Sequence, residues 1–503
     1  MTDAELEAQF KRNLLDRNWR LRNLYWITDK SGRKVKFSPN AAQLILLNSL
    51  WYLNLIVKAR QRGFTTLIDI LMLDACLFNS NVRAGIVADT RENVEIIFRD
   101  KIKFAYDNLP ESLRDAIETE QDQAKELLFG NNSSIRVGTS MRSGTLQYLH
   151  ISEFGKICRR YPDKAREIVT GSLQAVQAGQ FVFIESTSEG RGGEFHDMVQ
   201  TAEADKQAGK TLNEMEYRLH FFSWWDADEY EIDPEGVIIT DADREYFAKV
   251  ESKIGQSISL RKRAWYVLKK KTLKEKMTQE FPSTIDEAFE QAIEGAYYSK
   301  EMAAVRAEGR ICKIPVLPAV KVDTFWDIGR NDANSIWFMQ HVGMQHRFIR
   351  YYENSGEHLS HYALYMQQQG YLYGRIYVPH DAGNLMLGQK YTVAQQLERT
   401  FPGVTVIIVP RIASVTDGIN LVREEFASCW FDEENCATGL KHLDNYRKEW
   451  NERLGVWRDH PRHDEASNGA DAYRQFAQAK EVGLFSASTG SMRRKQAGNW
   501  RTV

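Results

Sequence analysis

Short apolar runs alternate with amphipathic stretches over residues 25–217, and this pattern predicts a layered α/β domain. Each run is rich in β-branched or aromatic residues and ends at polar residues, as expected of parallel strands buried on both faces. The runs are Leu53–Val57, Ala84–Ala88, Leu146–Ile151 and Phe181–Ile184. A polar stretch that extends to about Leu24 precedes them and is predicted to be a helical arm.

A second apolar pattern starts near Val322 and has a different order of elements. Three predicted strands follow one another closely, at Thr324–Ile328, Ser335–Met339 and Arg347–Tyr352. The pattern then predicts a helix at His358–Gln369, a strand at Arg375–Val378, a helix at Val393–Thr400, a strand at Val404–Val409 and a helix at Ile419–Cys429. Three hairpin-linked strands followed by alternating helices and strands are the order of a ribonuclease-H-like fold.

Together the two patterns predict four regions. They are an N-terminal arm with the first α/β domain (1–217), a bridging or lid segment (218–312), the second α/β domain (313–480) and a flexible basic tail (481–503). The 503 residues suffice for two or three domains at roughly 100–200 residues each. The tail is rich in Ser, Gly and Arg, a composition typical of disordered segments.

Composition narrows the class of protein further. Lys and Arg number 66 against 68 Asp and Glu, so a DNA-binding surface would have to be a local patch. The five cysteines are scattered without zinc-ribbon spacing, as expected of reduced thiols in a cytosolic protein. The acidic N-terminus is unlike a signal peptide, and no apolar run approaches the ~20 residues needed to span a membrane.

The first predicted strand leads into a basic turn that reads Lys-Ala-Arg-Gln-Arg-Gly-Phe-Thr-Thr over residues 58–66, followed by an apolar helix. A strand, a tight loop and a helix are the context of a phosphate-binding loop, in which backbone amides and the helix N-terminus face the phosphates. Only Gly63 and Thr65 match the pattern G-x-x-x-x-G-K-[ST], and Phe64 occupies the usual lysine position. The alternative is a basic turn before a buried helix. The predicted ATP-binding residues of the loop are Lys58, Arg60, Gly63, Thr65 and Thr66.

Other polar positions fit the same interpretation. The third apolar run ends in Ser152 and Glu153, where an acid can hold Mg²⁺ or orient water, although Ser152 stands where an Asp is usual. The fourth run leads into Ser186, Thr187 and Ser188, whose hydroxyls could sense a γ-phosphate or simply end the strand. Upstream of the loop, Gln43 could read adenine with its amide or be an ordinary surface glutamine.

Three acids in the second domain are candidate metal ligands. Asp327 lies within an apolar strand, Asp381 follows the strand Arg375–Val378, and Asp471 is placed at the start of the C-terminal helix. A carboxylate in a buried strand is costly unless a metal or a partner compensates it. In a ribonuclease-H-like fold these acids can converge on two divalent ions about 3.5–4 Å apart, one activating water and the other stabilising the leaving oxygen. Hard oxygen ligands favour Mg²⁺ or Mn²⁺.

Several polar residues nearby have two readings. Asp464 is either an auxiliary metal ligand, like the three acids, or the N-cap of the last helix. His380 and His463 are either general bases or hydrogen-bonding residues, and Glu353 is read as structural. A basic cluster at 261–271, interleaved with Trp265 and Tyr266, could contact DNA or a neighbouring subunit, or be a solvated helix face. The basic tail could dock on an acidic surface of a partner or only aid solubility.

Taken in order, these motifs resemble the large terminase subunit of tailed phages and herpesviruses. The resemblance runs from about Phe37 to Phe476. It is carried by the loop at 58–65, the strand ending in Ser152 and Glu153, and the bridge sequence from Met277 to Phe289. It is also carried by the Ser-Thr-Ser at 186–188, which resembles the family's motif for coupling ATP hydrolysis to movement. In the nuclease half it is carried by Pro-His-Asp at 379–381 and Gly-Ala-Asp-Ala-Tyr-Arg at 469–474. Phe64 and Ser152 depart from the family pattern, so Lys58 would supply the loop's charge and Thr65 would do more to hold Mg²⁺.

The resemblance implies a RecA/ASCE-like P-loop ATPase domain followed by a ribonuclease-H-like nuclease domain, with ATP, Mg²⁺ and, for the nuclease, Mn²⁺ as cofactors. By position, Arg142 is the candidate for an arginine that enters a neighbouring subunit's site, and a surface arginine is the alternative. The implied partners are double-stranded viral DNA, the portal of an empty procapsid, a small terminase subunit and further copies in a ring of five. The implied place of action is the host cytoplasm, and the protein is not expected to remain in the mature virion.

Two other functions were weighed against this resemblance. A helicase-nuclease would need a second RecA-like core after about Tyr217, where a nuclease pattern is found instead. A non-catalytic, capsid-associated scaffold or DNA-packaging protein is supported by Phe64 and Ser152, but an inert scaffold has no need for an Asp in a buried strand.

Overall fold

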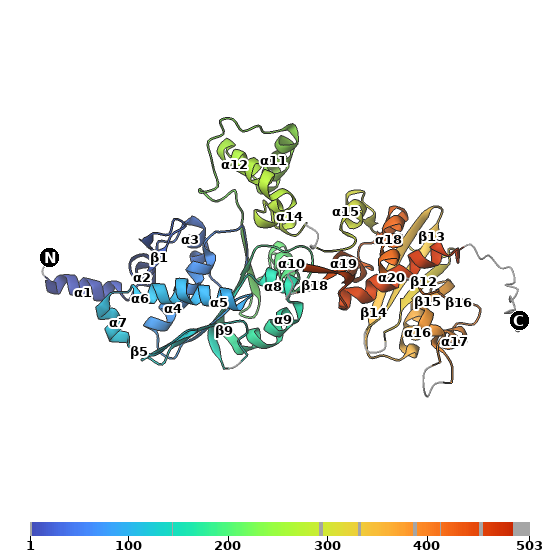
Figure 1. Ribbon diagram of the computed structural model, residues 1–503, viewed down its shortest axis with the longest axis horizontal. Helices are drawn as coiled ribbons and strands as arrows, with labels where there is room; N and C mark the ends of the chain where they lie inside the picture. The colour runs from blue at the N-terminus through green and yellow to red at the C-terminus, as the bar shows by residue number, and fades with distance from the viewer. Residues whose placement is uncertain are drawn as a thin grey trace, which may run out of the picture. The chain divides into compact units, whose positions relative to one another are not determined.

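Two compact units divide the chain, Met1–Ala292 and Ile293–Val503 (Figure 1). The computed structural model describes residues 3–142, 144–290, 295–329, 333–385, 390–412, 414–451 and 456–485. The predicted bridging segment (218–312) is split between the two units, and most of it belongs to the first. The predicted tail falls largely outside the described residues.

The first unit is built on an eight-stranded sheet with the order β10-β3-β9-β8-β4-β7-β6-β5. The strands from β10 to β7 are parallel, and β6 and β5 are antiparallel. Because β9 lies between β3 and β8, the sheet has the strand order of a RecA/ASCE-like P-loop ATPase, which confirms the predicted fold class. The bounds are β3 (Leu53–Lys58), β4 (Arg83–Val87), β5 (Thr119–Gln123), β6 (Glu126–Phe129), β7 (Ser134–Gly138), β8 (Leu146–Ser152), β9 (Val176–Ser186) and β10 (Tyr217–Phe222).

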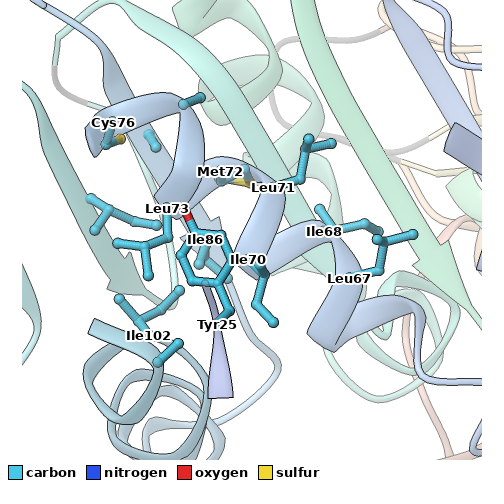
Figure 2. Packing of buried hydrophobic residues seen from close by; sticks show 14 of the residues in the cluster. Tyr25, Leu67, Ile68, Ile70, Leu71, Met72, Leu73, Cys76, Ile86 and Ile102 are labelled. Atoms are coloured by element: carbon cyan, nitrogen blue, oxygen red, sulfur yellow. The ribbon is translucent and has the colours of Figure 1, made fainter. Parts of the chain in front are cut away.

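Helices cover both faces of this sheet, because successive side chains of each strand point to opposite sides. On β3, Ile56 joins the core under α4, whereas Leu55 and Val57 join the core under α8 and α10. Figure 2 shows the α4 side, where Leu67, Ile70 and Leu73 of the helix lie among neighbours from other elements. The helices are α3 (Ala41–Asn48), α4 (Phe64–Phe78), α5 (Arg91–Ile97), α6 (Phe104–Asp107), α7 (Glu111–Ile117), α8 (Phe154–Arg160), α9 (Pro162–Glu167) and α10 (Glu194–Gln207).

The predicted N-terminal arm is helical, as α1 (Asp3–Asn13) and α2 (Arg17–Asn23), and it precedes a small hairpin of β1 (Trp26–Thr28) and β2 (Lys34–Lys36). A buried ion pair fastens α2 to α4: Arg20 donates to both carboxylate oxygens of Asp74 at 2.9 and 2.7 Å. Tyr25 donates a third hydrogen bond to the same carboxylate at 2.6 Å. These charge-assisted bonds fix the arm on the loop-bearing helix.

Three helices after β10 share a core of their own and are called the lid helices. They are α11 (Asp241–Ile254), α12 (Leu260–Leu273) and α13 (Met277–Glu280), and Figure 1 shows α11 and α12 side by side. Helix α14 (Ile285–Glu290) lies beneath them and packs into the core under α8 and α10. The core of the lid helices includes Trp224, Tyr230, Phe247 and Tyr266, and it also takes in Ala59 of the basic loop. The lid helices therefore pack directly against the loop after β3.

The second unit is a seven-stranded sheet with the order β11-β17-β14-β13-β12-β15-β16. Strands β12, β13 and β14 form the predicted antiparallel hairpins, and β15 and β16 continue the sheet parallel to β12. This order confirms the predicted ribonuclease-H-like fold. The bounds are β11 (Ile311–Cys312), β12 (Val322–Asp327), β13 (Asn334–Val342), β14 (Gln345–Asn354), β15 (Tyr373–Val378), β16 (Thr405–Ile408) and β17 (Cys429–Asp432).

Helices again cover both faces of the sheet. Phe325 and Trp337 pack with α15, α18, α19 and α20, whereas their sequence neighbours Trp326 and Ile336 pack with α16 and α17. The bounds are α15 (Ser299–Ala307), α16 (Leu359–Gln368), α17 (Val393–Thr400), α18 (Val415–Glu425), α19 (Ala437–Asn445) and α20 (Glu465–Glu481), with a hairpin of β18 (Lys448–Asn451) and β19 (Val456–Pro461).

One predicted helix ends earlier than its apolar pattern suggested. The helix expected over Ile419–Cys429 starts at Val415, ends at Glu425 and gives way to a 3₁₀ turn. Cys429 begins β17, which pairs with both β14 and β11. The prediction was wrong here because a short apolar segment such as 429–432 fits a helix end and an extra strand equally well.

Candidate active sites

The loop between β3 and α4 has the backbone expected of a phosphate-binding loop. Gln61 and Gly63 take positive φ angles of 59° and 76°, and α4 begins directly afterwards at Phe64. No side chain caps the start of α4, and its first turn holds no acid. Within the described residues, no side chain therefore caps the positive dipole end of this long buried helix, which suits an anionic ligand.

Lys58, the last residue of β3, lies buried at the base of the loop with 6% of its side chain exposed. Its Nζ is 2.9 Å from Glu185 Oε2 and 3.3 Å from Glu153 Oε1. Burial alone would lower the pKa of Lys58, but the two carboxylates outweigh it and hold that pKa above its ordinary value. Lys58 is thus a permanent positive charge beside the loop.

Glu153 is the first residue after β8 and has a left-handed backbone, with φ 57° and ψ 42°. This conformation is unusual for a residue other than glycine, and such strain is concentrated at functional sites. The side chain is one-third exposed, so the carboxylate reaches the surface on the loop side. Burial raises the pKa of Glu153, and Lys58 opposes that shift.

The structure adds one acid that the sequence analysis did not single out. Glu185, the penultimate residue of β9, is fully buried. It accepts hydrogen bonds from Thr65 Oγ1 at 2.6 Å and Ser152 Oγ at 2.9 Å. The signal was present in the sequence, because Glu185 follows an apolar run directly. The argument used for Asp327, that a carboxylate in a buried strand needs a partner, applies equally to it.

Behind Glu185 the buried network continues into α4. His150 on β8 lies 3.5 Å from Glu185 through Nε2 and 2.8 Å from Asp69 through Nδ1, and all three side chains are fully buried. Burial would lower the pKa of His150, but the two acids raise it to about 9. His150 is therefore a second buried cation, which compensates the acids behind the loop.

This shift predicts a pH dependence of stability. The folded pKa of about 9 exceeds the ordinary value of 6.5, so the contribution is complete below pH 6.5 and lost as pH rises through 9. The gap in unfolding midpoint between wild type and His150→Gln should be widest at pH 6.5 and close by roughly 6–12 °C near pH 10. The pKa difference between 6.5 and about 9 is worth about 3 kcal/mol over this range, and 1 kcal/mol shifts the midpoint by about 2–4 °C. Calorimetry of both proteins at several pH values measures this difference in unfolding midpoint.

His220 provides the matched control, because it is also buried in this unit but burial lowers its pKa to about 4. It is neutral throughout the range tested, so any gap between wild type and His220→Gln should stay constant from pH 6.5 to 10. A gap for His150→Gln that likewise does not change with pH would show that His150 is uncharged in the folded protein.

The other predicted residues of the ATP site lie around this cluster. Gln43 accepts a hydrogen bond from Asn40 N at 2.9 Å and donates one to Gly63 O at 2.7 Å, so its amide already holds the loop. Arg60 is mostly exposed and lies 3.4 Å from Glu280 of the lid helices. Thr66 is buried in the first turn of α4. Gln43, Gly63 and Arg60 thus link the loop to its surroundings.

The segment predicted to couple hydrolysis to movement follows Glu185 directly. Ser186 accepts a hydrogen bond from the Gly155 amide at 3.0 Å, in the turn that carries Glu153. Thr187 is buried, and Ser188 donates to the Gln279 carbonyl of the lid helices at 3.4 Å. One strand end therefore contacts both the acid-bearing turn and the lid helices.

Arg142 contacts a different part of the first unit. Its side chain is 62% exposed, and Nε lies 2.8 Å from Glu167 Oε1. It lines an open cavity of about 550 Å³ together with Thr145, Thr170 and Gln174. Arg142 is thus exposed at the rim of a cavity and paired with Glu167, and its role in a neighbouring subunit stays a prediction.

The second site is formed by acids of the second unit. Asp327 is the last residue of β12, and Asp381 lies in a 3₁₀ turn (His380–Gly383) just after β15. Burial, followed by the like charge of Asp471 and, more weakly, of Asp381, raises the pKa of Asp327 to about 7, against the opposing effect of Arg474. Asp471 and Asp381 are therefore both close enough to Asp327 to repel its carboxylate.

The sequence pattern placed Asp471 at the start of the C-terminal helix, and this prediction was wrong. Asp471 lies two turns into α20, which begins at Glu465. Its Oδ1 is 2.7 Å from Arg474 Nη1 and accepts a hydrogen bond from Tyr446 at 3.2 Å. Burial raises the pKa of Asp471, and Arg474 opposes this. Arg474 sits one turn further along the same face of the helix and supplies a compensating charge.

Within the described residues, no three Asp, Glu, His or Cys side chains converge tightly enough to hold a metal ion as they stand. The donor set nevertheless fits a hard divalent cation, because its donors are carboxylate oxygens and the charges of Asp471 and Asp381 destabilise ionised Asp327, which a cation would compensate. Asp327, Asp381 and Asp471 are the residues that would hold such an ion.

The neighbouring polar residues have identifiable partners. Asp464 caps α20 by accepting a hydrogen bond from the Ala466 amide at 3.1 Å, and it lies 3.3 Å from Arg462, so the N-cap reading describes it in this structure. His463 lies 3.1 Å from the Ser467 hydroxyl, and His380 is exposed. Glu353 accepts a hydrogen bond from Tyr351 at 2.6 Å.

The basic cluster of α12 is largely engaged within the lid region. Arg263 is 2.6 Å from Glu251, and Lys270 is 3.2 Å from Asp243. Tyr266 is buried in the lid core, and Trp265 stacks on a neighbouring aromatic ring. Much of this cluster is therefore a structural helix face. The basic residues of the tail lie outside the described residues.

Comparison with known proteins gives matches only at the level of structure. No family model matches the sequence, and no curated protein does. The large terminase of bacteriophage HK97 is 12% identical and matches over 95% of this chain and 100% of its own, with a TM-score of 0.44. The ATPase domain of the Thermus phage P74-26 large terminase is 14% identical over 49% of this chain and 94% of its own, with a TM-score of 0.31.

The nuclease domain of the phage P22 large terminase also matches, at 14% identity over 35% of this chain and 89% of its own, with a TM-score of 0.27. The matched proteins are thus large terminases, the family that the sequence motifs resemble. All three TM-scores are below 0.5, so the chemistry of this chain is inferred from its own residues. Among the helices of the described residues, none is long and apolar enough to cross a membrane.

Proposed function

We propose that this chain is the large subunit of a viral terminase, which uses ATP hydrolysis to drive double-stranded DNA into a procapsid and cuts the DNA with a metal-dependent nuclease. The observation that carries the proposal is the cluster at the base of the loop. There Lys58 lies between Glu153 and Glu185, at the start of a loop that leads into an uncapped helix. A scaffold would have no use for buried charges held at this edge of the sheet, because burying charges is costly.

In the ATPase site each residue has a separate task. Lys58 and the loop amides would bind the phosphates, and Thr65, with its hydroxyl held by Glu185, would hold Mg²⁺. Mg²⁺ supplies neutralisation of the charge that develops on the phosphates. Glu153, at the surface-facing end of β8, would orient the attacking water, and Ser186, Thr187 and Ser188 would pass the change to the lid helices.

In the nuclease site, Asp327, Asp381 and Asp471 would hold Mg²⁺ or Mn²⁺. The ions supply an activated water and stabilisation of the leaving 3′ oxygen. Arg474 and Tyr446 keep Asp471 oriented, because both contact its Oδ1. The raised pKa of Asp327 fits a site that is completed by a cation, since a cation favours the ionised carboxylates.

The partners follow from this function. The chain would act in the host cytoplasm as a ring of five copies, as the family resemblance implies, on the portal of an empty procapsid, with a small terminase subunit that selects viral DNA. In such a ring the exposed Arg142 would enter the neighbouring subunit's ATP site and stabilise the transferring phosphoryl group. Asp464 would serve the nuclease as the N-cap of α20, with a direct metal contact as the alternative.

The replacement Glu153→Gln tests the proposed ATPase directly. It should leave binding of a fluorescent ATP analogue within about twofold of wild type, because Lys58 keeps Glu185 as its partner at 2.9 Å. Hydrolysis should fall by at least about 10²-fold, the lower end of what a positioned acid–base group contributes. Phosphate release and analogue titration on the same preparation give both values.

Glu189→Gln is the matched control, because Glu189 is another partly buried acid of this unit and pairs with Arg159 rather than with Lys58. It should hydrolyse ATP at nearly the wild-type rate. If Glu153→Gln instead lost binding and hydrolysis together, Glu153 would be a structural residue or a metal ligand and not the residue that orients water.

A further inference from the structure

The carboxylate of Glu185 occupies the place that an acid on the neighbouring strand usually fills. In P-loop ATPases the Mg²⁺ site is completed by an Asp at the end of the strand that here ends in Ser152. Strand β9 lies between β3 and β8, and Glu185 is in register with Ile56 on one side and Ser152 on the other. Its side chain therefore lies beside the vacant acid position.

The contacts of Glu185 are those expected of the missing acid. Its Oε1 accepts hydrogen bonds from Ser152 Oγ at 2.9 Å and from Thr65 Oγ1 at 2.6 Å. Thr65 is the second residue of α4, directly after the loop, and is the hydroxyl that would reach Mg²⁺. Ser152, the residue that replaces the usual acid, thus donates a hydrogen bond to the carboxylate that stands in for it.

We propose that Glu185 is the positioning residue for the Mg²⁺–nucleotide complex, acting through the Thr65 hydroxyl, and that it has taken over this role from the strand end at Ser152. The inference rests on the proposed ATPase function and specifies which acid serves the cation. The cation-site acid and the Ser-Thr-Ser coupling segment are then consecutive in the chain at the end of β9, so a displacement of Glu185 is passed directly to Ser186.

The charges around Glu185 support this assignment. The side chain is fully buried, and burial would raise its pKa, but Lys58 and His150 hold the pKa of Glu185 well below its ordinary value. A buried acid that is kept ionised by two cations is costly to build. The cluster reaches the surface only partly, through the half-buried Thr65 and Glu153, on the side where the loop amides face a ligand.

The test measures how strongly Mg²⁺ tightens nucleotide binding. A fluorescent ATP analogue is titrated into the full-length protein in Mg²⁺ and in EDTA. The readout is the Kd ratio, which is the Kd in EDTA divided by the Kd in Mg²⁺. Glu185→Gln should reduce this ratio by about 10-fold or more, the lower end of what outer-shell partners contribute to metal affinity. Its Kd in EDTA should change by less than about twofold, because Lys58 and the loop amides remain.

Asp69→Asn is the matched control, since Asp69 belongs to the same buried network through His150 but contacts neither Thr65 nor Ser152 among its recorded hydrogen bonds. It should reduce stability and leave the Kd ratio unchanged. If Glu185 served stability alone, both Asp69→Asn and Glu185→Gln would lower stability and leave the Kd ratio unchanged.

The exchange variant Ser152→Asp with Glu185→Ser moves the acid back to β8 without changing the number of buried charges. It should bring the Kd ratio to within about threefold of wild type, whereas Glu185→Ser alone should not. This comparison also decides the matter if Glu185→Gln does not fold. A wild-type Kd ratio in folded Glu185→Gln, or an exchange variant no better than Glu185→Ser, would overturn the inference while the wild-type ATPase stands. Failure of the wild-type protein to hydrolyse ATP would instead overturn the proposed function itself.

Discussion

Replacing Lys58 with alanine is expected to abolish ATP hydrolysis, lowering the rate by at least about 10³-fold, the scale of losing one preorganised charge at a phosphoryl group. Phe64 occupies the usual lysine position, but its side chain carries no charge and is buried in the core. Lys58 is the cation at the base of the loop, and its removal also leaves Glu185 and Glu153 facing each other without the charge between them, so that only His150 compensates Glu185. Phosphate release and binding of a fluorescent ATP analogue measure the two effects.

Arg60→Ala is the matched control, because Arg60 is a cation of the same loop but is mostly exposed and pairs with Glu280. It should lower the rate by less than about tenfold, as expected of an exposed ion pair in a loop. Near-normal turnover in Lys58→Ala, or an equal loss in the two variants, would show that another group supplies the charge to the phosphates.

Replacing Asp327 with alanine is expected to abolish DNA cleavage and to leave ATP hydrolysis within about twofold of wild type, because sites without shared partners seldom couple. Asp327 ends β12, an inner strand of the second sheet, and its pKa is raised by burial and by Asp471 and Asp381. Without it, an ion would lose the ligand that the other two acids flank. Nicking of supercoiled plasmid in Mg²⁺ or Mn²⁺ is the measurement, and Asp381→Ala and Asp471→Ala should behave alike.

Asp323→Asn provides the matched control on the same strand. Burial raises the pKa of Asp323 to about 6, but its carboxylate accepts a hydrogen bond from the Arg375 amide at 2.8 Å and takes no part in the three-acid site. Asparagine can keep that bond, so cleavage should persist. Continued cleavage in all three alanine variants would place the nuclease site elsewhere.

The sequence was sufficient to predict the central strands of both sheets. Strands such as Leu53–Val57 are buried on both faces, so their apolar runs can be recognised in the sequence without any knowledge of tertiary contacts. Strands β5 and β6 were missed because they lie at the end of the sheet and carry mixed polar patterns such as Thr-Glu-Gln-Asp-Gln. Strand β17 was missed because its four residues continue an apolar helix pattern.

Individual site residues were predictable where one position had to carry a charge. Lys58, Glu153 and Asp327 stand at strand ends, where the chain leaves the sheet, and their types alone mark them. Glu185 was missed because its role depends on β9 lying between β3 and β8. The local pattern of apolar and polar residues does not predict the order of strands in a sheet. His150 and Asp69 were missed for the same reason, since they meet only when α4 packs on the sheet.

The central claim is that one chain carries two independent active sites, and a reciprocal assay tests it most directly. Wild type, Lys58→Ala and Asp327→Ala are each purified and assayed for phosphate release from ATP and for nicking of supercoiled DNA. Wild type should show both activities, Lys58→Ala should retain nicking without ATP hydrolysis, and Asp327→Ala should retain ATP hydrolysis without nicking. Loss of both activities in either folded variant, or absence of ATP hydrolysis in wild type with Mg²⁺, would contradict the account.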